Sequence, residues 1–130
     1  MTLSRSKARV LALIAILVVM ALQAFNSFAC YEHNLLTFLG SLAFIAIPML
    51  PALVAMATKN PLRSVGASLL FAPWLPFAYY TDCVQPYQGG GASMVYVVVV
   101  FYGFVTALVG AVLSGPVLSR LGVRVAAGEA

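Results

Sequence analysis

The sequence predicts an all-α integral membrane protein, folded as an antiparallel bundle of four transmembrane helices with both termini on the cytoplasmic side. Composition is the first reason: 63% of the 130 residues are hydrophobic and only 8% are charged, against about 25% charged residues in soluble domains. The mean hydropathy is +1.04. The second reason is that four apolar runs lie at about residues 10–28, 35–58, 64–80 and 92–118. Since one membrane helix needs about 20 residues, a single transmembrane domain fills residues 1–130.

The first run follows a basic tail that contains Arg5, Lys7 and Arg9. It is long enough to span a bilayer, so we expect it to be retained as the first helix. A secretory signal is the competing interpretation, because the basic tail, the apolar stretch and "SFA" before Cys30 resemble a cleavable leader. Cleavage would leave three helices with a new amino terminus outside, and the sequence alone does not decide between the two.

The second and third runs each contain a Pro-x-x-Pro pair, which predicts helix kinks at Pro48, Pro51, Pro73 and Pro76. At about 1.5 Å per residue, Pro51 and Pro73 fall near the middle of the bilayer. Paired broken helices at that depth supply backbone carbonyls to substrates in several transporters. Prolines are also tolerated in membrane helices whose neighbours satisfy the freed backbone groups, and we expect this more common situation.

The fourth run carries a face of small residues. Gly103, Ala107, Ala111 and Gly115 recur every four residues, and such a face lets two helix backbones approach closely. The partner is either another helix of this chain or a different subunit, and the sequence leaves both open. A barrel is not expected, since no run alternates apolar with polar residues.

The distribution of positive charge predicts the orientation of the four spans. With four crossings, the two tails and the "KNPLR" loop share one side, which by the positive-inside rule is cytoplasmic. The pI near 9.4 thus reflects topology and contact with lipid, and does not indicate nucleic-acid binding. That side holds every lysine and arginine: Arg5, Lys7, Arg9, Lys59, Arg63, Arg120 and Arg124.

Both cysteines fall at outward ends of predicted helices, Cys30 after the first and Cys83 after the third. In an oxidising compartment such as a bacterial periplasm, two thiols at the same depth form a disulfide. The sequence therefore predicts a Cys30–Cys83 bond and a bacterial-type inner membrane with the cysteines on the outer side. A thiol oxidoreductase is disfavoured, because that chemistry uses a closely spaced Cys-x-x-Cys pair and a second pair as relay.

The second cysteine is the third residue of the polar stretch "TDCVQPYQGGGAS", residues 81–93. Pro86 stiffens the approach and residues 89–91, all glycine, permit tight turns, so the stretch could fold across the mouth of the bundle. We expect a flexible connector rather than a lid. A phosphate-binding loop is not expected, because the lysine and hydroxyl residue of that motif are missing.

Polar residues inside the predicted spans are few. Gln23 and Asn26 are the strongest candidates for a buried polar site, and no Asp, Glu, Lys, Arg or His lies within any run. A buried carboxylate for proton coupling is therefore missing. His33 alone cannot supply paired haem ligands. The sequence predicts no catalytic residue, no cofactor and no metal site.

These features favour a small non-enzymatic protein that acts through helix–helix contacts, as an accessory, assembly or immunity-type interaction subunit. The expected partners are the lipid bilayer and either another membrane protein or a second copy of the chain. The alternative is a homo-oligomeric channel or an uncoupled transporter of small solutes, which the mid-membrane prolines and uncharged polar groups suggest.

Overall fold

The computed structural model describes residues 2–30, 32, 34–84 and 95–126, and the chain in these ranges is mostly helical. The glycine run at 89–91 and Pro86 lie outside them. Two π-helical turns, η1 (Asn26–Cys30) and η2 (Tyr80–Val84), extend α1 and α5, and the strands are β1 (Thr2–Leu3) and β2 (Arg124–Val125). The α-helices are α1 (Arg5–Phe25), α2 (Leu35–Ile45), α3 (Leu50–Met56), α4 (Leu62–Phe71), α5 (Trp74–Tyr79) and α6 (Val95–Arg120).

Two helices among the described residues are long and apolar enough to cross a membrane, Arg5–Cys30 and Tyr96–Arg120. A third crossing results if α2 and α3, which meet at 76°, form one broken span. The prediction of apolar membrane helices is confirmed at this level. The first helix begins at Arg5, earlier than the apolar run, because the Ser4 side chain caps it by accepting a hydrogen bond from the Lys7 backbone N–H.

The second run is divided between α2 and α3 by a turn over residues 46–49. Pro48 lies in this turn and Pro51 in the first helical turn of α3, where a missing backbone N–H costs no intrahelical bond. The Asn34 side chain caps α2 by accepting from the Thr37 backbone N–H at 2.8 Å. The two prolines therefore coincide with the 76° bend between α2 and α3.

The third run is divided in the same way, into α4 and α5. Pro73 caps α5 and Pro76 lies inside it. The break leaves the Leu70 carbonyl to accept from the Thr106 hydroxyl at 3.0 Å, and that hydroxyl accepts from the Trp74 indole N–H at 2.9 Å. The hydroxyl on α6 thus takes the place of a lost intrahelical donor.

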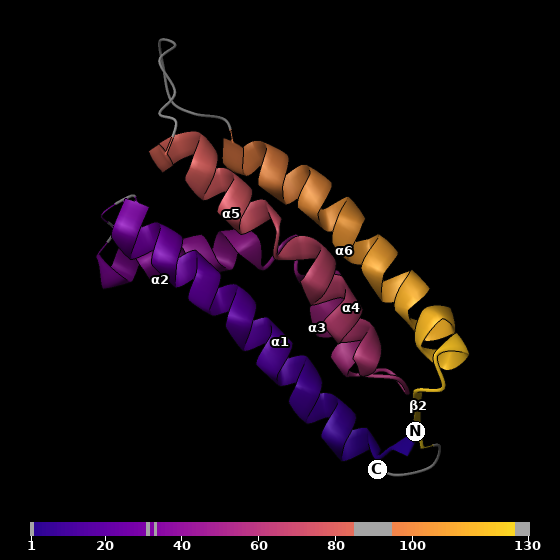
Figure 1. Cartoon of the computed structure of the whole chain (residues 1–130). Coiled ribbons are helices and arrows are strands. Elements are labelled where there is room, and N and C mark those ends of the chain that lie inside the picture. Colours follow the sequence, from indigo (N-terminus) through magenta and orange to yellow (C-terminus); the bar gives the residue numbers. More distant parts are fainter. Residues whose placement is uncertain (1, 31, 33, 85–94, 127–130) are drawn as a thin grey trace.

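Three contacts fix which segments share an end of the molecule. β1 pairs with β2 in parallel, so the segments before α1 and after α6 lie side by side. Arg5 donates to the Ala57 and Thr58 carbonyls, which brings the end of α3 to the same place (Figure 1). The opposite end holds η1 and η2, joined by a disulfide between Cys30 and Cys83.

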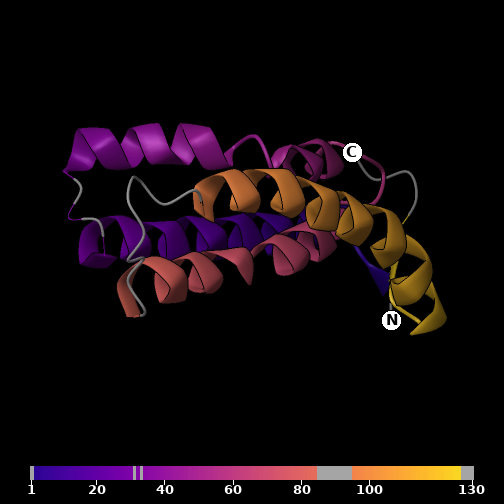
Figure 2. The ribbon, with the colours of Figure 1, turned by 90° about the horizontal axis from the view of Figure 1, so that it is seen from above.

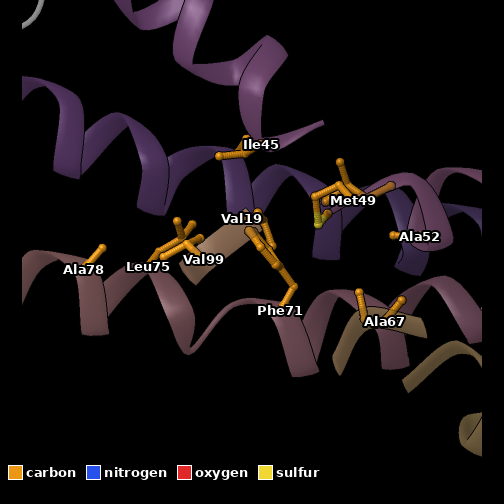
Figure 3. Close-up of a cluster of buried hydrophobic side chains, with 11 residues drawn as sticks. Val19, Ile45, Met49, Ala52, Ala67, Phe71, Leu75, Ala78 and Val99 are labelled. Carbon is orange, nitrogen blue, oxygen red and sulfur yellow. The ribbon is translucent and has the colours of Figure 1, made fainter. Parts of the chain in front are cut away.

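The core is formed by side chains from all six α-helices, gathered around Phe71 (Figure 3). By contrast, α2 lies along one edge of the molecule (Figure 2), and Ile45 is its one buried residue. The buried cluster consists of Ile16, Val19, Ile45, Met49, Ala52, Ala67, Phe71, Leu75, Ala78, Val99 and Ala107.

Candidate functional site

The two polar residues predicted inside the first span belong to one buried group, the polar cluster, which also includes Ser27, Ser41 and Tyr96. Gln23 is 1% exposed and Asn26 is 2% exposed. The Gln23 amide donates to Ser41 Oγ at 3.0 Å and to Ser27 Oγ at 3.3 Å, and its carbonyl accepts from the Tyr96 hydroxyl at 2.9 Å. The cluster therefore joins α1, η1, α2 and α6.

Asn26 connects the polar cluster to α5. Its amide donates to the Leu75 carbonyl at 3.0 Å and to the Tyr96 hydroxyl at 3.3 Å. Ser41 donates to the Phe38 carbonyl at 2.7 Å, and the hydroxyls of Ser27 and Ser41 lie 3.2 Å apart. Every side-chain N–H and O–H of the cluster thus has an acceptor within the protein, which is the arrangement of a structural network rather than of an open binding site.

We expect Gln23→Leu to destabilise the protein by about 1–2 kcal/mol, because the Tyr96 hydroxyl loses its acceptor and Ser41 loses one donor inside an apolar bundle. Unfolding of the purified protein by a denaturing detergent, followed by circular dichroism, measures this loss. Thr37→Val is the control, since its side chain is exposed on α2. Equal stability of the Gln23→Leu variant and the wild type would show that the cluster contributes nothing.

The small-residue face of α6 packs against α4 of the same chain. Ala107 is fully buried and Ala111 partly buried. A Cβ atom built on Gly103 would lie 2.6 Å from Phe71 Cε1, and one built on Gly110 would collide with the backbone of Gly66. The intramolecular alternative therefore accounts for this face, and a partner protein would have to use another surface.

Gly115 has a separate role, because the Arg63 guanidinium lies over it. Arg63 donates to the Ala111 carbonyl at 2.9 Å and to the Val112 carbonyl at 3.0 Å. Pro116, inside α6, has no N–H to offer Val112 four residues earlier. Arg63 therefore replaces the donor that the proline removes, and a side chain at position 115 would force its guanidinium to move.

The predicted disulfide is present. The Cα atoms of Cys30 and Cys83 are 5.8 Å apart, within the range that a disulfide spans without backbone movement. Both cysteines are used in this bond, so neither is a free thiol. Among the described residues, no group of three or more His, Cys, Asp or Glu side chains is arranged to hold a metal ion.

Comparison of the chain with protein-family models, curated proteins and solved structures gives no match. Its function must therefore be argued from its own geometry.

Sequence reasoning missed Tyr96, Ser27, Gly66 and Arg63 as members of these contacts. Tyr96 resembles an ordinary interfacial aromatic residue, and Arg63 resembles a topology signal in the cytoplasmic loop. Gly66 carried a usable signal, because it lies within the small-residue segment "SVGAS" of the third run. Such a segment is the natural counterpart of a small-residue face on another helix.

Proposed function

We propose that this chain is a multi-pass protein of a bacterial-type inner membrane that crosses the bilayer four times, with α2–α3 and α4–α5 as broken spans. The β1–β2 pairing and the contact of Arg5 with the end of α3 support this path, because they bring both tails and the α3–α4 connection to one end. The disulfide supports it as well, since it joins the ends of α1 and α5 at the other.

The charges favour an orientation with both tails in the cytoplasm. All lysines and arginines lie in the tails, in the α3–α4 connection or in the helical turns next to them, which the positive-inside rule assigns to the cytoplasmic face. The cysteine end then faces the periplasm, where disulfides persist.

Within the bilayer, the protein acts without enzymatic chemistry, as an accessory, assembly or immunity-type subunit that binds an apolar helix of another membrane protein. The observation that carries this proposal is the exposure of α2: ten of its eleven residues are not buried, and Leu36 is 78% exposed. Helix α2 is held to the rest of the chain by few contacts. These are the polar cluster, the burial of Ile45 and a ring contact between Phe28 and Phe38, together with the bend into α3. A second helix can therefore pack against the open side of α2 with little rearrangement.

Gly40 marks the contact point on α2. A Cβ atom built there would meet nothing within 4 Å, in contrast to the glycines of α6. An open glycine on an exposed helix gives a partner helix close backbone approach, which is how helices associate in lipid. The face that the sequence suggested for partners, on α6, is already covered by α4.

Photo-crosslinking in the native membrane tests this role. A photoreactive amino acid at Leu36 on α2 is expected to give one discrete adduct with a foreign membrane protein, whereas the same group at Phe101 on α6, which is 70% exposed, serves as the control. Gly40→Leu is expected to weaken the Leu36 adduct about five- to tenfold without unfolding the protein.

Equal labelling from Leu36 and Phe101 would contradict a partner site on α2. An adduct of the chain with itself alone would favour the homo-oligomeric channel or transporter.

The broken helices are the observation that favours this alternative. The channel or transporter has weaker support, because the Leu70 carbonyl freed at the α4–α5 break already accepts a hydrogen bond from Thr106. The amides of Gln23 and Asn26 also donate to groups of the protein itself.

A further inference from the structure

A second apolar surface lies between α1, α4 and α6 at the end that carries the basic residues. It is a groove of about 520 Å³, and its lining includes Leu3 of β1 and Val123, the residue before β2. Its α1 wall includes Leu11, Ile14 and Ala15. The groove is separate from the exposed face of α2 and from the polar cluster.

The α4 wall of the groove covers about two thirds of the hydrocarbon depth of one leaflet. Its α4 wall runs from Leu62 to Leu69, or about 10 Å at 1.5 Å per residue, and a leaflet contributes about 15 Å of hydrocarbon. The residues that line the groove are apolar except for Ser114, which lies on α6. An extended acyl chain therefore matches both its direction and its chemistry.

The end of the groove is positively charged. Lys7 lies one helical turn before Leu11 on the same face of α1, and its side chain is exposed. The first turn of α1 contains no acidic residue, so the positive end of the helix dipole adds to the positive potential there. Arg9, by contrast, lies on the opposite face of the helix.

We propose that this groove binds one phospholipid with an anionic headgroup, whose acyl chain lies along α1, α4 and α6 and whose phosphate is held by Lys7. The inference rests on the proposed membrane placement but needs no partner protein. The lipid covers an apolar surface that the helices leave open, and the ammonium group selects the headgroup charge.

Photoactivatable lipids test the site in reconstituted vesicles of phosphatidylcholine. One set contains phosphatidylglycerol with a diazirine in its acyl chain, and the other contains phosphatidylcholine labelled in the same way. We expect the anionic lipid to label the peptides that contain Leu11–Ala15 and Leu62–Leu69 more strongly than the neutral lipid does. Lys7→Gln is expected to reduce this labelling about fivefold, the effect of one basic residue near the surface.

Matched control variants test whether the position of the charge and the shape of the groove determine the labelling. Arg9→Gln makes the same charge change on the other face of α1 and is expected to leave the labelling unchanged. Ala15→Phe fills the groove and is expected to reduce labelling of its walls more than tenfold, whereas Ala43→Phe on the exposed surface of α2 is expected to have no effect.

Three results would overturn the proposal. Equal labelling of the groove by both lipids would show that the headgroup is not selected. Equal losses of labelling in the Lys7→Gln and Arg9→Gln variants would show that Lys7 does not form a specific site. Failure of the protein to insert would overturn the membrane placement itself. That failure is recognisable, because labelling would then also be lost at the exposed α6 surface around Phe101, whereas failure of the groove alone leaves it intact.

Discussion

Gly110→Leu is expected to destabilise the protein by at least about 3 kcal/mol, which is the upper end of the usual range for overpacking a close contact. The reason is that its first side-chain atom would collide with the Gly66 backbone, which cannot rotate away as a side chain can. The helices α4 and α6 would have to separate along their whole contact, from Phe71 to Arg63. Denaturing-detergent titration of the purified variant, monitored by circular dichroism, measures the loss.

Gly40→Leu is the matched control for this experiment, because it adds the same side chain to an apolar helix where nothing lies within 4 Å. We expect its midpoint of unfolding to remain close to that of the wild type. Similar midpoints for the Gly110 and Gly40 variants would contradict the close crossing of α4 and α6.

The second large effect is expected from the disulfide. The bond joins residues 53 apart, and loop-closure entropy for such a separation is about 4 kcal/mol. Since helices inserted in a bilayer have less freedom to lose, the measured loss for Cys30→Ser with Cys83→Ser is expected to fall between about 2 and 4 kcal/mol. The unfolding titration of the double variant against the oxidised wild type gives this value.

The control is the wild type in reductant, which should match the double variant if the bond alone is responsible. Alkylation of native membranes provides an independent measurement. We expect neither thiol to react until reductant is added, and reaction of both thiols without reductant would show that the bond does not form in the cell.

The presence of long apolar helices could be predicted because the length of an apolar run is a local property of the sequence, whereas the start of α1 at Arg5 could not, since it depends on the cap that Ser4 provides. The breaks near Pro48 and Pro73 follow from proline chemistry. The 76° bend between α2 and α3 could not be predicted, because a proline removes a hydrogen bond without fixing the direction in which the chain continues. The two-residue strands β1 and β2 are too short to show any periodic pattern.

The site residues divide in the same way. Gln23 and Asn26 were recognisable because an amide inside an apolar run requires a partner. The partners of these amides could not be identified from the sequence, because Tyr96 lies 73 residues from Gln23 and contacts it only through the packing of α6. The small-residue face of α6 was recognisable, but its assignment to α4 required the position of Gly66.

The hydrogen bonds that Arg63 donates to α6 near Pro116 bear on how the chain is assembled during synthesis. Arg63 donates to a carbonyl of α6 that emerges from the ribosome 48 residues later. The close backbone contact of Gly66 with Gly110 also forms only after α6 has been synthesised. Until then α4 presents an unsatisfied guanidinium and a short, interrupted apolar stretch to the translocon. In the proposed four-crossing placement, α4–α5 and α6 are therefore expected to partition into lipid together, as one hairpin.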